Sequence, residues 1–135
     1  MESGVKKMGR SKYRNIATLT SDGIQHDSMK EARRWCELCV LERAGVITDL
    51  KRQVKYVLIP SQVESYERFS PKTGHQLKNG IRTIEKECSY IADFVYIDVK
   101  TGETIAEDTK GMRTEAYRIK RKLMLWVHGI RIKET

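Results

Sequence analysis

Two acidic residues, Asp93 and Asp108, flank a short glycine-containing segment and are candidates for metal-ion chemistry. If residues 99–102 form a four-residue hairpin loop, Asp93 lies directly across from Asp108 on the partner strand. Like charges opposed on one sheet face have Cβ atoms about 5 Å apart and destabilise the sheet unless something compensates them. A divalent cation is the simplest compensator, because Mg²⁺ accepts two carboxylates and a backbone carbonyl while keeping several waters.

A lysine follows the second of these carboxylates at a spacing that places it on the same sheet face. Lys110 is two residues beyond Asp108, so period-two alternation puts its ammonium about 7 Å further along the strand. Glu107 falls on the opposite face and is interpreted as structural or solvent-facing. Two alternatives remain open. A three-residue loop would place Thr109 opposite Asp93 and make the carboxylates diagonal neighbours, and Asp93 and Lys110 can form a structural ion pair.

Glu31 and Gln53 are further candidates with two interpretations each. Ser28 and Glu31 have the spacing of a capping box, in which the glutamate reaches back to the helix start. The same Glu31 carboxylate can instead hold a metal ion or its water, and one residue can switch between the two roles. Gln53 lies in the middle of an expected strand, where it can approach the site or serve as a hydrogen-bonded core amide.

Local sequence patterns predict the elements that position these residues. In chain order they are a short strand or hairpin at 16–25, a helix from Ser28 to Gly45, a strand at 46–59, a surface loop at 60–80, an extended segment at 81–98 whose part 90–97 is covered on both faces, its hairpin partner at 103–110, a helix at 114–129 and a last strand at 130–133. This order predicts an α/β fold with a mixed central β-sheet flanked by helices.

Apolar residues at helical spacing define the faces that the two helices bury. The buried stripe is expected to comprise Ala32, Trp35, Cys36, Leu38, Cys39 and Leu41 in the first helix, and Tyr117, Leu123, Met124 and Val127 in the second. The length of 135 residues and 15.7 kDa predicts one domain, at 15–135, preceded by a flexible basic arm at 1–14.

The net charge of +8 is concentrated in two stretches of the chain. Residues 1–14 carry five basic residues against one acidic residue, and residues 110–122 carry six against one. Clustered cations favour a polyphosphate partner, although a solvated helix face and a solubilising tail would have the same composition. The candidate nucleic-acid contacts on the second helix and directly before it are Arg113, Tyr117, Arg118, Lys120, Arg121 and Lys122.

The cysteines and the apolar runs indicate a cytoplasmic protein. Three cysteines are too few for a disulfide framework, and the C-x-x-C pair Cys36 and Cys39 is interpreted as two small buried thiols. The longest apolar run, 123–127, is far shorter than the roughly 20 residues that span a bilayer, and no apolar stretch follows the basic N-terminus. Membrane and secreted classes are therefore set aside.

Taken together, the candidate residues resemble the active-site pattern of the PD-(D/E)XK nuclease superfamily. The segments that carry the resemblance are Tyr90-Ile91-Ala92-Asp93-Phe94, Glu107-Asp108-Thr109-Lys110-Gly111 and the helix residue Glu31. The chain is most similar to small phage-encoded, single-domain members akin to Holliday-junction resolvases, over roughly residues 26–133. It departs from the pattern in having no proline before Asp93.

The resemblance implies a restriction-endonuclease-like core and a metal-dependent DNA endonuclease that hydrolyses phosphodiester bonds with Mg²⁺ or Mn²⁺. Asp93, Asp108 and the carbonyl of Thr109 would ligate the metal, and Glu31 would hold the metal or a water. Lys110 would orient the attacking water, lower its pKa or stabilise the phosphate. The basic stretches would clamp the DNA backbone without reading bases, which suits an enzyme selective for branched or junction DNA in phage recombination or DNA processing.

Other functions on the same scaffold are a non-catalytic nucleic-acid-binding module, an exonuclease and a ribonuclease. Small nucleases of this kind often act as dimers, so a homodimer is an expected partner besides DNA, although the sequence shows no clear dimerisation stripe. The expected location is the cytoplasm, which for a phage-encoded protein is that of the host.

Overall fold

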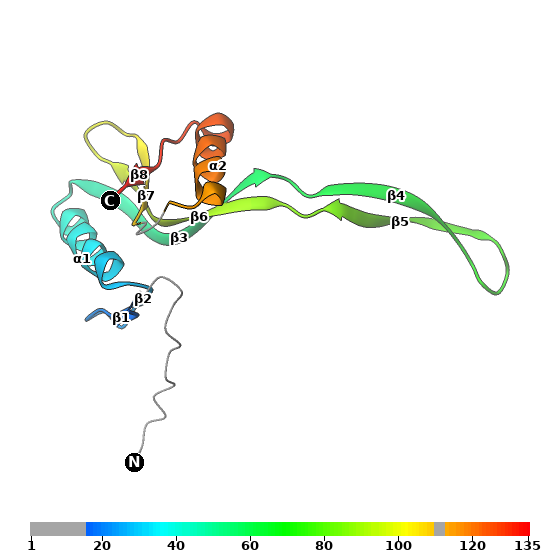
Figure 1. Ribbon diagram of the computed structural model, residues 1–135, viewed down its shortest axis with the longest axis horizontal. Helices are drawn as coiled ribbons and strands as arrows, with labels where there is room; N and C mark the ends of the chain where they lie inside the picture. Colours follow the sequence, from blue (N-terminus) through cyan, green and yellow to red (C-terminus); the bar gives the residue numbers. More distant parts are fainter. Residues whose placement is uncertain (1–15, 110–112) are drawn as a thin grey trace, which may run out of the picture.

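The structure is a computed structural model that describes residues 16–109 and 113–135. It is a mixed α/β body from which a long β-hairpin projects (Figure 1). In chain order the elements are β1 (Thr18–Leu19), β2 (Gln25–His26), α1 (Met29–Arg43), β3 (Ile47–Ile59), β4 (Gln62–Phe69), β5 (Gln76–Glu85), β6 (Cys88–Asp98), β7 (Thr104–Asp108), α2 (Glu115–Leu123), the π-helical turn η1 (Met124–His128) and β8 (Lys133–Glu134).

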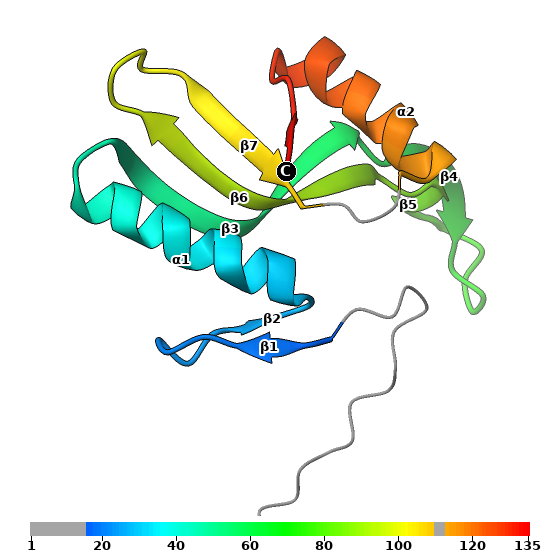
Figure 2. The same ribbon diagram turned by 60° about the vertical axis from the view of Figure 1, so that its left-hand side comes forward.

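The body is built on a four-stranded sheet in the order β3-β6-β7-β8. The β3/β6 and β6/β7 pairs are antiparallel and the β7/β8 pair is parallel, so the sheet is mixed, as predicted. Helix α1 packs on one face and α2 with η1 on the other, each over its own apolar cluster (Figure 2). The central strand β6 is therefore covered on both sides.

The β6–β7 hairpin has the predicted four-residue loop. The backbone N–H of Asp98 donates to the carbonyl of Glu103 at 3.0 Å, and Phe94 pairs with Glu107. One step further along this register, Asp93 lies opposite Asp108. The alternative three-residue loop is therefore wrong.

Helix α1 begins and ends where its capping residues predict. The Ser28 hydroxyl accepts a hydrogen bond from the backbone N–H of Glu31 at 3.1 Å, and Gly45 after the helix has a φ of 76°. Leu38 is fully buried against the sheet. The expected burial of both thiols is wrong: Cys36 is exposed and Cys39 is half-buried, because the buried stripe of α1 is narrower than predicted.

The second helix starts where the sequence predicts, with Thr114 as its cap, and continues into a π-helical turn that ends at Gly129. Tyr117 and Met124 are buried as expected, but Val127 is 46% exposed. A π-helical turn has more residues per turn than an α-helix, so it rotates Val127 away from the face that an α-helical spacing predicts.

Strand β6 changes the face that it buries near Asp93. Tyr90 and Ala92 pack in the cluster under α2, whereas Phe94 and Tyr96 pack in the cluster under α1. Strict alternation would place all four on one face. The change places Asp93 between Ala92, in the cluster under α2, and Phe94, in the cluster under α1.

The predicted surface loop at 60–80 is instead most of a β-hairpin, formed by β4 and β5 and closed by a turn at 70–75. The sequence Asn79-Gly80, a dipeptide typical of turns, lies inside β5. There Tyr66 covers Gly80 so closely that a Cβ atom at Gly80 would lie 2.4 Å from the tyrosine ring. The pairing of an aromatic residue with a cross-strand glycine explains why this glycine can sit within a strand.

The two short terminal strands compare differently with their predictions. The β1/β2 hairpin is present, whereas the last strand lies at 133–134 rather than at 130–133. The basic arm predicted at 1–14 and the candidate Lys110 lie outside the described residues. Among the helices of the described chain, none combines the length and the apolar character needed to cross a membrane.

Candidate active site

Side chains from three elements meet beside the N-terminus of α1. Glu31 comes from the first turn of the helix, Gln53 from the middle of β3 and Asp93 from the middle of β6. The Gln53 amide donates a hydrogen bond to Glu31 Oε1 at 3.2 Å. In the β3/β6 register Gln53 lies opposite Asp93, because the residues flanking each of them are paired.

Glu31 is the most perturbed carboxyl group of this cluster. Its side chain is buried, with 3% of the residue exposed, and burial together with the nearby negative charge of Asp93 raises its pKa to about 7. Its backbone N–H fulfils one half of the capping box with Ser28, but among the described residues its carboxylate is hydrogen-bonded to Gln53 rather than to the Ser28 backbone. Of the two interpretations of Glu31, this geometry favours a side chain directed into the site.

Two basic side chains that the sequence analysis did not select also face Glu31. His26 Nδ1 lies 3.7 Å from Glu31 Oε1, and burial followed by the charge of Arg52 lowers the pKa of His26. The charge of Arg52 also acts on Glu31 and partly offsets the rise in its pKa. The only sequence signal for His26 is its position two residues before the helix cap, which is weak without knowledge of the β1/β2 hairpin.

The two opposed aspartates are each held by hydrogen-bond donors. Asp93 Oδ2 accepts from the backbone N–H of Thr109 at 2.8 Å and from its hydroxyl at 3.0 Å. Asp108 is buried, and its Oδ2 accepts from the Tyr90 hydroxyl at 2.5 Å. The sequence predicted that a cation compensates the opposed charges, and these donors are a compensation that it did not predict.

Gln53 occupies an unusual backbone conformation for a strand. Its φ is 53°, in the left-handed region, which costs an L-residue roughly 1–2 kcal/mol. The residue is exposed, so it is not the core amide that one interpretation expected. Backbone strain of this kind persists where the surroundings enforce it and is concentrated at functional sites. Here the strained residue is the one that holds Glu31.

Glu107 is structural, as alternation predicted. It is fully buried on the α1 face, where Arg34 binds it through two nitrogens at 2.7 and 2.8 Å and the Tyr96 hydroxyl also donates to it. Although burial opposes the shift, the hydrogen bonds from Arg34 and Tyr96 lower the pKa of Glu107. This ion pair ties α1 to β7 and holds Glu31 in position relative to Asp93 and Asp108.

The carboxylates of Glu31 and Asp93 are oxygen ligands of the type that divalent cations bind. Glu31 and Asp93 are close enough to interact by charge, and Thr109 contacts Asp93 through its backbone N–H and its hydroxyl. Among residues 16–109 and 113–135, no three His, Cys, Asp or Glu side chains converge as a metal-ligand group. Two carboxylates, a carbonyl and several waters are a ligand set that Mg²⁺ accepts.

The structure divides the candidate nucleic-acid contacts on α2 and directly before it into two groups. Glu134 on β8 accepts from the Tyr117 hydroxyl at 3.1 Å and pairs with Arg121 at 2.8 Å and Arg113 at 2.5 Å. The Tyr117 ring is buried, so it does not offer the nucleic-acid contact for which Tyr117 was a candidate. The second group comprises Arg118 and Lys122, which are exposed, and Lys120, which is half-buried.

A second basic region, missed by the sequence analysis, lies on the other side of β8. A hollow between α1 and β8 is lined by Lys30, Arg33, Arg34, Glu37, Lys133 and Thr135. Lys30 and Arg33 are exposed and lie on the same turns of α1 as the buried Glu31. Exposed cations therefore lie on both helices.

Comparison with known proteins identifies one family. No curated protein and no solved structure matches the chain. A family described as "Protein of unknown function (DUF1064)" matches residues 10–130, a range that contains Glu31, Gln53, Asp93, Asp108 and Lys110. Since the match spans most of the sequence, the chain belongs to the DUF1064 family.

Proposed function

We propose that the protein is a metal-dependent DNA endonuclease with a PD-(D/E)XK-type site on a restriction-endonuclease-like core. The observation that carries the proposal is the meeting of Glu31, Gln53 and Asp93 beside the strand end that bears Asp108 and Thr109. The element order supports it, because α1, β3, β6, β7, α2 and β8 follow the helix, strand, strand, strand, helix, strand order of such a core.

In this proposal Asp93, Asp108, the Thr109 carbonyl and Glu31 hold Mg²⁺ or Mn²⁺. The ion would supply a water of lowered pKa and positive charge against the phosphate. Thr109 orients Asp93 and Tyr90 orients Asp108 through the hydrogen bonds described above. Without the ion, burial and the charge of Asp93 raise the pKa of Glu31 to about 7, and the positive charge of a bound ion would favour the carboxylate form that acts as a ligand. Lys110 is assigned to the reacting water or phosphate.

DNA is the proposed substrate because exposed cations lie on both helices. In this proposal Arg118 and Lys122 on α2, and Lys30 and Arg33 on α1, would contact phosphates of the DNA backbone. Contacts to phosphates do not read the base sequence. We therefore propose that the enzyme recognises the structure of its substrate, which is branched or junction DNA. The proposed location is the cytoplasm, supported by three cysteines that remain unpaired.

The test is cleavage of a panel of linear, nicked, flapped and four-way-junction DNA with and without Mg²⁺. Asp93→Asn, Asp108→Asn and Lys110→Ala should each lower the cleavage rate by about 10²-fold or more, because each removes a ligand or a charge at the reacting phosphate. Glu103→Gln is the matched control, since it removes a carboxylate from an exposed hairpin position outside the site. Its rate should equal that of the parent protein.

Two outcomes would contradict the proposal. Full activity in Asp108→Asn and Lys110→Ala would show that cleavage does not arise at this site. Metal-independent DNA binding without cleavage of any panel member would assign the chain to the nucleic-acid-binding modules. Cleavage restricted to RNA or to DNA ends would keep the site and change the substrate class.

A further inference from the structure

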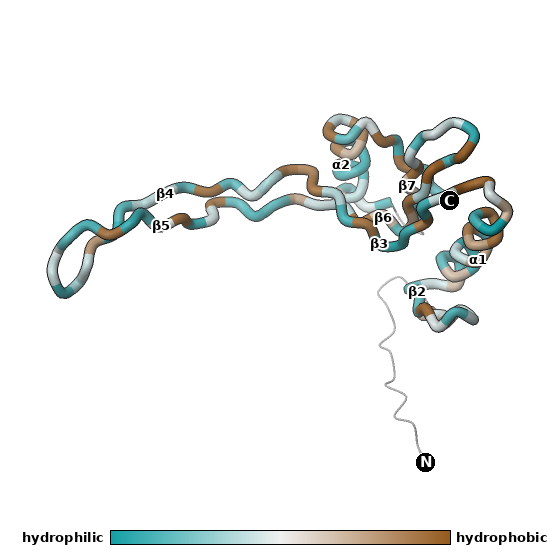
Figure 3. The backbone as a smooth tube through the Cα atoms, turned by 180° about the vertical axis from the view of Figure 1, so that it is seen from behind, coloured by the Kyte–Doolittle hydropathy of each residue, from teal (hydrophilic) through white to brown (hydrophobic). Residues whose placement is uncertain are grey.

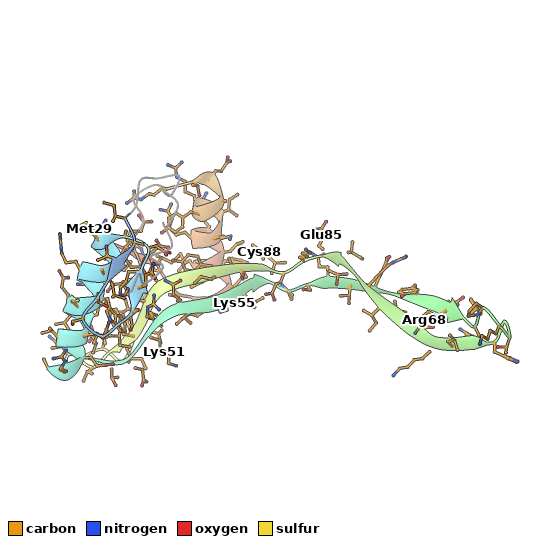
Figure 4. All side chains as sticks on the ribbon, turned by 90° about the horizontal axis from the view of Figure 1, so that it is seen from below. Met29, Lys51, Lys55, Arg68, Glu85 and Cys88 are labelled. Carbon is orange, nitrogen blue, oxygen red and sulfur yellow. The ribbon has the colours of Figure 1, made fainter. Side chains whose placement is uncertain are left out.

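The projecting hairpin is a separate structural unit with two open edges. Strands β4 and β5 form their own two-stranded sheet, which extends away from the body (Figures 1 and 4). Among the described residues, no other strand pairs with the outer edge of either one. An isolated two-stranded hairpin is marginally stable in water, and unpaired strand edges are templates for another chain.

The two edges differ in regularity. One register shift leaves Ile84 of β5 without a partner in β4, and the other places two residues of β5 opposite Glu67 of β4. The extra residues thus all belong to β5, and bulges are a device that blunts an edge strand. Strand β4 runs without an extra residue from Gln62 to Phe69, so its edge is the one open to pairing.

The composition of the hairpin favours a protein partner over DNA. Strands β4 and β5 together carry three basic and three acidic residues, whereas the whole chain has a net charge of +8. A strand pair that tracked DNA would need an excess of cations. Val63, Phe69 and Ile81 are instead exposed apolar residues, with 54%, 55% and 72% of their surface accessible, and apolar and polar residues are interspersed along the hairpin (Figure 3).

The sequence of β4 is complementary to itself when read in the antiparallel direction. With Tyr66 at the centre, Val63 lies opposite Phe69 of a second copy, and Glu64 lies opposite Arg68 of that copy. In each pair the two side chains lie on the same sheet face, because the residue numbers of the partners differ by an even number and residues at even spacing along a strand share a face. Apolar residues thus meet apolar residues and an acid meets a base twice, once on each side of the centre.

We propose that the protein forms a homodimer in which β4 pairs antiparallel with β4 of a second copy about Tyr66. The result is a four-stranded ribbon with a two-fold axis, in which the open β4 edges disappear and the bulged β5 strands become the outer edges. The two bodies lie at opposite ends of this ribbon, because each body is attached at the start of its own β4.

The first measurement is the particle mass of the full chain in solution by sedimentation equilibrium, without DNA or metal. The parent protein should approach twice 15.7 kDa as its concentration rises. Arg68→Glu should raise the dissociation constant by about tenfold or more, because symmetry turns two attractive pairs into two repulsive ones. Lys78→Glu, with the same charge change on the bulged β5, should leave the constant unchanged.

The second measurement fixes the register. Glu64→Arg should weaken the dimer as Arg68→Glu does, although it also removes an ion pair with Arg82 within its own hairpin. When the two singly changed proteins are mixed, arginines at both positions of one chain face glutamates at both positions of the other. The mixture should therefore form a heterodimer, whereas neither protein alone should form a homodimer of comparable stability.

The proposal is overturned if the parent protein stays at 15.7 kDa at every concentration, or if neither charge reversal changes the dissociation constant. A dimer that Arg68→Glu weakens but that the mixture does not restore would exclude this register. Circular dichroism of each variant confirms that the body is folded. The inference is independent of the proposed nuclease activity, because its readout is mass in the absence of DNA.

Discussion

At the scale of single residues, the buried carboxyl of Glu31 has the clearest physical consequence. Its pKa in the folded protein is about 7, above the value of 4.5 that it has when exposed. The folded state therefore binds the extra proton between these values, and the stability of the folded protein falls as the pH rises through this window.

Glu31→Gln removes that pH dependence while keeping the shape of the side chain. In EDTA, we expect the stability of the variant relative to the parent to increase by up to about 3 kcal/mol between pH 4 and pH 8, the amount that corresponds to the pKa shift. Urea unfolding at a series of pH values measures this difference. Glu103→Gln is the control. If the free energy of unfolding of Glu31→Gln changed with pH in parallel with that of the parent, ionisation of Glu31 would not destabilise the folded protein.

The second residue-scale prediction separates backbone strain from the site. Gln53→Gly should stabilise the protein by up to about 1 kcal/mol, because glycine adopts a φ of 53° without the steric cost. It should lower nuclease activity, because Glu31 loses its hydrogen-bond donor. Asp49→Gly is the matched control: Asp49 has a φ of 54°, so the same substitution relieves similar strain and should leave activity unchanged. If the two variants had equal activities, Gln53 would have no role in the site.

At the scale of elements, the contact between α1 and β7 depends on an ion pair whose acidic member is fully buried. Arg34→Met leaves the Glu107 carboxylate without its main partner, so we expect a loss of about 3–5 kcal/mol in the free energy of unfolding at pH 7. Adding Glu107→Gln to this variant should recover part of the loss. Urea unfolding of the parent, the two single variants and the double variant measures the coupling.

The sign of the pH effect provides a check on this pair. The pKa of Glu107 is lowered in the folded protein, so its stabilising contribution is complete at neutral pH and disappears as the pH falls through that lowered value. The difference between the parent and Arg34→Met should therefore shrink in acid. A difference that stays constant down to pH 3 would mean that Arg34 acts through packing rather than charge.

At the scale of the whole molecule, the hairpin and the body should be separable. Ile59 pairs with Cys88 at the base of the hairpin, so replacing residues 60–87 with Asn-Gly closes β3 onto β6 by a two-residue turn. We expect the melting temperature of the body to change by less than about 5 °C, because β4 and β5 form their own sheet. Thermal unfolding and particle mass measure the two effects, and the shortened protein should be monomeric at all concentrations.

In the same shortened protein, single incisions in nicked or flapped DNA should continue, since every candidate site residue lies in the body. Paired incisions in a junction, one by each copy of the proposed dimer, should be lost because the shortened protein is monomeric. Loss of all cleavage with an unchanged melting temperature would show that the hairpin itself contributes to the site.

The sequence by itself determined the local features of this protein. The caps Ser28 and Thr114 set the helix starts, and the loop at 99–102 set the register that opposes Asp93 and Asp108. Alternation separated Glu107 from Asp108. Each of these depends on interactions within a few residues, or on a strand pair joined by a short loop, so residue types and spacing are sufficient to predict them.

Only the tertiary structure decided what surrounds the candidate residues. The approach of β2 and β3 to α1 places His26 and Gln53 beside Glu31, and β8 brings Glu134 to the arginines of α2. The left-handed conformation of Gln53, the burial that shifts the pKa of Glu31 and the projection of β4 and β5 have no local signal. Burial and electrostatic environment are set by segments distant in sequence, and a one-dimensional pattern does not specify which of those segments meet.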